Sequence, residues 1–131
     1  MRDNHEGLPE LIDACERDGA FFAVVAVTLA GETRQFEIGL QEDAYRAVKR
    51  VLGSRPFDQL PGVPYRYFFV PSTARTERGT AEVDFRIEQG AAGRQFSFEI
   101  PLSLAQNLLW FFQLKDFGST SHLRCVAPNY T

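Results

Sequence analysis

The chain has 131 residues, of which 44% are hydrophobic and 24% are charged, and it carries a formal net charge of -3. This length suits one folded domain, 1–131, and the composition excludes a chain that is disordered throughout. The acidic balance, with a pI near 5.4, removes the general electrostatic argument for a protein that binds nucleic acid or an anionic membrane.

Several features of the sequence favour a soluble, cytoplasmic protein. The N-terminal segment carries acidic residues where a secretion signal needs a basic head and an apolar stretch. The two cysteines, Cys15 and Cys125, are too few for a disulfide scaffold or a cluster of metal ligands. The longest apolar run, Phe21 to Val27, is much shorter than the roughly 20 residues of a membrane-spanning helix. We therefore expect no cofactor, no metal site and no membrane contact.

A helix and a β-hairpin are the first elements predicted along the chain. Apolar residues recur at helical spacing from Leu8 to Cys15, which predicts a short helix over 8–18. The segment 21–29 is apolar at odd-numbered and even-numbered positions alike, as in a strand covered on both faces. The segment 34–40 alternates apolar and polar residues, so it predicts a half-buried strand paired with the preceding one.

The remainder of the chain predicts two more helices and three more strands. Acidic residues begin the segment 42–52 and basic residues end it, as the helix dipole favours. The last elements are strands at 65–70, 80–88 and 94–100 and a helix at 104–114. Ser103 and Gln106 have the spacing of a capping box at the start of this last helix. Irregular tails are expected over 1–7 and 118–131.

The element order α-β-β-α-β-β-β-α predicts an α+β fold. We expect a two-layer sandwich with a mainly antiparallel sheet of about five strands and helices on one face. The tripeptide RQF occurs at 34–36 and again at 94–96, 60 positions later, each time in a strand that precedes a helix. This repetition favours a strand-strand-helix unit that occurs twice in the chain. The alternative is convergence, because small α+β folds often have this layout.

The last helix is the first candidate interaction site. Apolar residues surround almost its whole circumference, which is more than a helix on a single sheet can bury. Clusters of tryptophan and phenylalanine are uncommon on a surface except at interfaces. We therefore expect a homodimer or a permanent protein partner to cover this helix through Leu104, Leu108, Trp110, Phe111 and Phe112.

The outward positions of two predicted strands form the second candidate. They are mainly acidic and include Glu82, Asp84, Glu88 and Glu99. One interpretation is the solvated face of an antiparallel sheet, which normally has this composition. The other is a docking surface for a basic partner, whose binding would weaken with added salt.

The third candidate surrounds the segment 71–79, which predicts a polar hairpin loop. Tyrosine rings and guanidinium groups bind single-stranded nucleic acid or phosphate ligands by stacking and ion pairing. The residues concerned are Arg66, Arg75, Arg78, Tyr65 and Tyr67. The alternative is an aromatic strand in the core that ends in a solvated hairpin tip.

Residues 65–115 resemble in layout the PUR-type and PC4-type single-strand-binding repeats, with an aromatic strand, an arginine-bearing loop, two more strands and a helix. The resemblance implies nucleic-acid binding on a curved sheet, although the sheet face that is basic in those families is acidic here. In size, acidity and apolar helix the chain also resembles the small acidic secretion chaperones of bacteria, which are dimeric and wrap an unfolded partner segment. Neither resemblance assigns a role to an individual residue.

The sequence contains no glycine-rich phosphate loop, nucleophile elbow or zinc-ligand spacing. Both histidines, His5 and His122, lie in the predicted tails. We therefore predict no catalytic residues and a non-catalytic protein-interaction module, such as an adaptor, a secretion chaperone or an immunity-type inhibitor. A single-stranded nucleic-acid-binding protein is the first alternative, and a small enzyme with a carboxylate-based pocket is the second.

Overall fold

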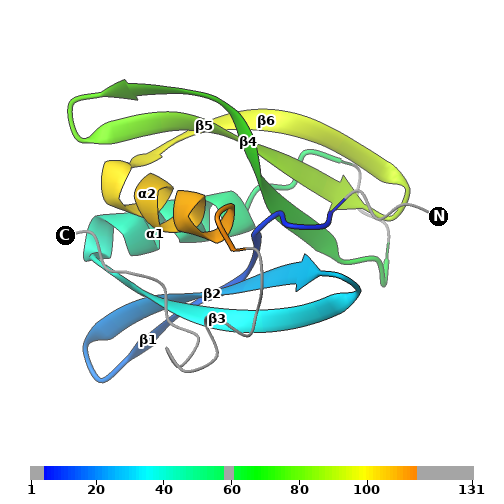
Figure 1. Ribbon diagram of the computed structural model, residues 1–131, viewed down its shortest axis with the longest axis horizontal. Helices are drawn as coiled ribbons and strands as arrows, with labels where there is room; N and C mark the ends of the chain where they lie inside the picture. Colours follow the sequence, from blue (N-terminus) through cyan, green and yellow to red (C-terminus); the bar gives the residue numbers. More distant parts are fainter. Residues whose placement is uncertain (1–4, 58–60, 115–131) are drawn as a thin grey trace.

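The computed structural model describes residues 5–57 and 61–114, and among these it describes all side chains except those of 71–75 and 77. The described chain forms a six-stranded antiparallel sheet and two helices in the order β-β-β-α-β-β-β-α (Figure 1). The predicted α+β class and antiparallel sheet are therefore confirmed. The predicted first helix and the count of five strands are wrong. The predicted tail 118–131 lies outside the described residues.

The eight elements fall into two units of the same composition. The first unit consists of β1 (Glu10–Arg17), β2 (Ala20–Leu29), β3 (Glu32–Leu40) and α1 (Glu42–Leu52). The second unit consists of β4 (Tyr65–Glu77), β5 (Thr80–Gln89), β6 (Ala92–Pro101) and α2 (Leu102–Phe111). The strand order in the sheet is β3-β2-β1-β4-β5-β6, so the units meet where β1 pairs with β4. Figure 1 shows a strongly bent sheet whose two halves enclose both helices.

The segment predicted as the first helix is the central strand β1. Its ladder with β2 has a register shift between Leu11 and Asp13, and this irregularity puts both Leu11 and Ala14 into the core at 2% and 5% exposure. Ile12, between them, is 41% exposed. A strand with such a bulge buries residues three positions apart, and this is also the spacing of a helix face. The helical pattern in the sequence therefore arose from an irregular strand.

Two boundaries in the second unit also differ from the prediction. β4 continues to Glu77 through a register shift between Val70 and Arg75, so most of the predicted hairpin loop is strand. α2 begins at Leu102 after Pro101, and no side chain caps it. Pro101 ends β6 and also precedes the helix, so Ser103 lies inside the first turn and not at the N-cap position.

The two units share one strand register. Every residue pair of the β2–β3 ladder has a counterpart 60 positions later in the β5–β6 ladder; for example, Val25 pairs with Phe36, and Phe85 pairs with Phe96. The RQF tripeptides lie at equivalent places in β3 and β6. The two units thus form a structural repeat, which agrees with the predicted repeated unit, although its origin by duplication stays a prediction.

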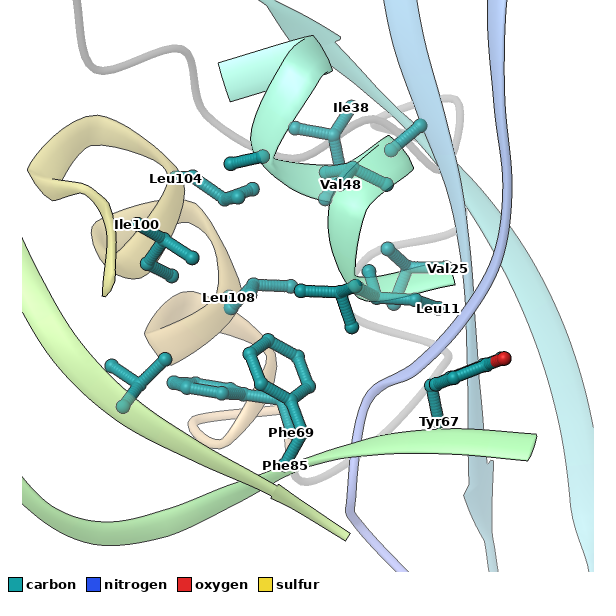
Figure 2. Packing of buried hydrophobic residues seen from close by; sticks show 14 of the residues in the cluster. Leu11, Val25, Ile38, Val48, Tyr67, Phe69, Phe85, Ile100, Leu104 and Leu108 are labelled. Carbon is teal, nitrogen blue, oxygen red and sulfur yellow. The ribbon is translucent and has the colours of Figure 1, made fainter. Parts of the chain in front are cut away.

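The helices follow the same repeat. The buried residues of α1 are Ala44, Ala47, Val48 and Val51. The buried residues of α2 are Leu104, Asn107, Leu108 and Phe111, each 60 positions later. Figure 2 shows side chains from both helices and from all six strands converging on one core. Each helix therefore presents one face to this shared core and another face away from it.

Candidate functional site

The residues of the predicted α2 interface separate into two groups. Leu104, Leu108 and Phe111 are completely buried in the core of their own chain. Trp110 and Phe112 are half-buried at the margin of the core. Trp110 packs edge-on against Phe36 of β3, with ring centroids 6.4 Å apart. The bent sheet therefore covers more of α2 than a flat sheet would.

Part of the surface of α2 nevertheless remains accessible to solvent. We call it the α2 outer face, and it consists of Ala105, Gln106, Leu109, Trp110 and Phe112. Leu109 is 51% exposed and is one of only two large hydrophobic side chains with high exposure among the described residues. Phe112 lies 5.1 Å from Phe69, measured between ring centroids, and still retains partial exposure. Of the predicted interface only Trp110 and Phe112 belong to this face, and its other three residues were not among those predicted.

α1 carries charged side chains at the equivalent positions of the fold. Lys49 and Arg50 of α1 are exposed, and their counterparts in α2 are Leu109 and Trp110. Arg46 ion-pairs with Glu42, one turn earlier on the same helix. α2, in contrast, contains no charged residue at all. The fold therefore does not require an apolar outer face on this helix, because the equivalent helix has a charged one.

The acidic residues of the predicted docking face lie on β5 and β6, and hydrogen bonds within the sheet occupy most of them. Asp84 accepts from Ser97 Oγ at 2.6 Å, and Glu99 accepts from Thr80 Oγ1 at 3.1 Å. Glu82 is opposite Glu99 in the ladder. These carboxylates share one face of the sheet, and the structure brings them together with donors of the same chain.

Glu88 is the centre of an ion-pair network on this face. Its Oε2 atom lies 2.8 Å from both His5 Nε2 and Arg86 Nε. The His5 ring stacks on Phe68, with centroids 4.0 Å apart. Burial alone would raise the pKa of Glu88, but the hydrogen bonds from His5 and Arg86 outweigh it and hold the pKa below its usual range. Glu88 is therefore ionised near neutral pH and fixes the N-terminal segment to the sheet.

Arg66 and the two tyrosines of the third predicted site lie on opposite faces of β4. Arg66 makes a bidentate ion pair with Glu10, with N–O distances of 2.9 and 3.0 Å. Tyr65 and Tyr67 pack against the core on the other face. Arg78 is exposed at the β4–β5 hairpin, and the side chain of Arg75 lies outside the described residues. The tyrosine rings and Arg66 thus face different directions.

A cavity of about 640 Å³ opens where the C-terminal end of α1 meets β1, the start of β4 and the end of β5. We call it the Gln89 pocket. Among its lining residues are Ile12, Asp13, Lys49, Arg55, Tyr67 and Gln89. Arg55 donates through Nη1 to the carbonyl oxygens of Leu52 and Ser54 at 2.8 and 3.0 Å and also to the Tyr67 hydroxyl. The pocket was not predicted from the sequence.

The described residues do not form a recognisable catalytic centre. The Cys15 thiol donates to Asp13 Oδ2 at 3.4 Å, and burial together with this carboxylate raises the pKa of the thiol. A thiol with a raised pKa is not an activated nucleophile. Burial likewise raises the pKa of the Tyr67 phenol, so this hydroxyl is neutral near pH 7. Histidine, cysteine and carboxylate side chains of the described chain form no cluster suited to a metal ion.

No family model, curated protein or solved structure matched this chain. Neither helix in the described part is long and apolar enough to cross a membrane. Function is therefore inferred from the geometry of the chain itself. Among the described residues, the α2 outer face and the Gln89 pocket are two features that the fold alone does not explain.

Proposed function

We propose that this chain is a non-catalytic, cytoplasmic protein-interaction module that forms a homodimer through the α2 outer face. The observation that carries the proposal is the contrast at equivalent helix positions. Leu109 and Trp110 of α2 replace the exposed cations Lys49 and Arg50 of α1. Leaving such a group of apolar side chains in water has no benefit for folding, whereas covering it with protein stabilises the complex.

A second copy of the chain is the partner that best suits this face. The chain has a net charge of -3, so two copies repel each other in most relative orientations. The α2 outer face contains no charge, so the repulsion between two such faces is smallest there. A contact between identical helix faces also closes around a two-fold axis, which limits assembly to a dimer. The roles of an adaptor, a secretion chaperone and an immunity-type inhibitor all fit such a module.

Sedimentation velocity of three variants tests the proposal. Leu109→Lys gives α2 the residue that α1 carries at the equivalent position. We expect it to weaken the dimer by at least about tenfold, because charge at the centre of an interface costs more than 1.4 kcal/mol. Gln106→Lys, one turn earlier on α2, should have a smaller effect because its side chain is already polar and exposed.

The third variant controls for the other apolar surface of the chain. Val24 is half-buried on the outer side of β2, and its counterpart in β5 is Asp84. Val24→Asp should leave the dimer unchanged if α2 is the contact. A dimer that survives Leu109→Lys but dissociates with Val24→Asp would contradict the proposal.

A further inference from the structure

Gln89 is a buried polar residue at a position where the fold does not require one. It is 1% exposed, and its Nε2 atom donates to the Val63 carbonyl oxygen at 3.3 Å. Its Oε1 atom has no hydrogen-bond partner among the described residues. A buried acceptor without a donor costs stability. The equivalent residue of the first unit is Leu29, so this place in the fold accepts an apolar side chain.

Gln89 lines the same pocket as two cations. Arg55 is held in place by its Nη1 hydrogen bonds and by packing over the Tyr65 ring, with its guanidinium carbon 4.7 Å from the ring centroid. Its Nε and Nη2 atoms form no hydrogen bond to any described residue, so they can bind an anion. Lys49 also lines the pocket, and its Nζ atom lies 6.0 Å from the centroid of the Tyr45 ring.

The other lining residues define the rest of the site. Among the described lining residues Asp13 is the one carboxylate, and it accepts from the Ala14 amide at 2.8 Å and from Cys15. The described lining therefore carries two cations and one carboxylate, which is a positive balance. Ile12, Leu52 and Val63 provide an apolar wall. A volume of about 640 Å³ lies within the range of small-molecule sites in proteins.

We propose that the Gln89 pocket binds a small organic anion that also carries a hydrogen-bond donor. The anionic group binds Arg55 and Lys49, because a fixed guanidinium binds carboxylate or phosphate in two-point contacts. An O–H or N–H group of the ligand donates to Gln89 Oε1. The apolar body of the ligand lies between them against the wall formed by Ile12, Leu52 and Val63. This site is independent of the proposed dimer.

The proposal is tested with two probes that differ by one donor, 4-hydroxybenzoate and benzoate. Each is titrated into the ¹⁵N-labelled full-length chain, and amide chemical shifts report the position and strength of binding. We expect saturable shifts centred on the pocket, with 4-hydroxybenzoate bound about fivefold more tightly, since one additional hydrogen bond has about that effect. Arg55→Gln should weaken both probes by about tenfold or more, because it removes the charge.

Gln89→Leu distinguishes the role of the amide from a structural role, since it places the residue of the first unit at this position. It should abolish the preference for 4-hydroxybenzoate and leave benzoate binding unchanged. Its denaturation midpoint without ligand should be equal to or above that of the wild type, which checks that it folds. Arg46→Gln, an exposed residue outside the pocket, is the matched control for Arg55→Gln. Absence of saturable shifts at millimolar probe, or a preference that survives Gln89→Leu, would overturn the proposal.

Discussion

The two β-β-β-α units have the same register and the same buried helix positions, but their surfaces are opposite in character. On the outer side of β2 the first unit carries Phe22, Val24, Ala26 and Thr28. At the equivalent places of β5 the second unit carries Glu82, Asp84, Arg86 and Glu88. The helices show the reverse pattern, with a charged outer face on α1 and an uncharged one on α2.

This contrast separates what folding requires from what it merely permits. Positions that are apolar in both units, such as Val48 and Leu108, serve the core. Positions that differ between the units are not fixed by the fold, so another requirement selects their residues. Leu109 and Gln89 are of this second kind, because their counterparts are Lys49 and Leu29. Each unit thus serves as an internal control for the other.

The largest expected effect concerns the shared core. Leu108→Ala removes three carbons from a fully buried site and should lower the free energy of unfolding by about 2–5 kcal/mol. Its counterpart Val48→Ala removes fewer atoms and should have a smaller effect. Because side chains from both units meet in one core (Figure 2), each variant should unfold in a single transition by chemical denaturation and circular dichroism.

The expectation of a single unfolding transition depends on the contact between the two units. β1 and β4 are joined by only two residue pairs, Glu10 with Phe68 and Leu11 with Tyr67. Two separate transitions in Leu108→Ala, one for each unit, would show that this junction and the core do not couple the units. Gln106→Ala on the exposed side of α2 should change stability by less than about 0.5 kcal/mol and provides the control.

A smaller effect is expected at the first hairpin of each unit. Gly19 and Gly79 occupy equivalent turns with φ values of 80° and 69°. A methyl group at either position would meet no atom within 4 Å, so only the backbone conformation opposes substitution. Gly19→Ala and Gly79→Ala should each cost about 1–2 kcal/mol, and the two values should agree. Thermal denaturation measures both, and clearly unequal costs would contradict the equivalence of the turns.

The smallest expected effect is on the pH dependence of stability, to which the charged outer face of β5 contributes and the uncharged outer face of β2 does not. The pKa of Glu88 lies below its ordinary value of 4.5, so the folded state binds this proton less readily than the unfolded state. The stability that Glu88 contributes is therefore fully present above about pH 4.5 and is lost as the pH falls through the lowered pKa. Thr28, its counterpart, carries no charge and contributes nothing to this dependence.

Glu88→Gln should accordingly reduce the difference in unfolding free energy between about pH 7 and about pH 3 by about 1 kcal/mol. Urea denaturation at the two pH values measures it. Glu37→Gln is the control, because Glu37 is exposed and its ion pair with Arg17 spans 3.8 Å. An equal pH dependence in the wild type and Glu88→Gln would show that the network with His5 and Arg86 does not stabilise the fold.

The local pattern of apolar, polar and charged residues predicted most of the fold. Strict alternation in β5 placed Ala81, Val83, Phe85 and Ile87 inward, and all four are buried. The bounds of α1 agree with the prediction because acidic and basic residues mark its ends. β1 failed because its bulge produces a helical spacing of buried residues, and only its pairing with the adjacent β2 and the distant β4 identifies it as a strand. Register shifts of this kind are set by tertiary contacts and leave no simple pattern.

The candidate sites were predictable to different degrees. The apolar character of α2 was evident in the sequence, but the bend of the sheet decides which of its residues remain accessible. The Gln89 pocket was missed because its lining residues come from separate segments, and Gln89 adjoins Gly90 in what reads as a turn. A signal was nevertheless present, because Gln89 continues the inward parity of Phe85 and Ile87.

Sedimentation equilibrium of the wild-type chain measures whether the apolar α2 outer face brings two copies of the chain together. We expect a reversible dimer at tens of micromolar, with a dissociation constant in the micromolar range or below. A chain that stays monomeric at these concentrations, with Leu109→Lys sedimenting identically, would contradict it.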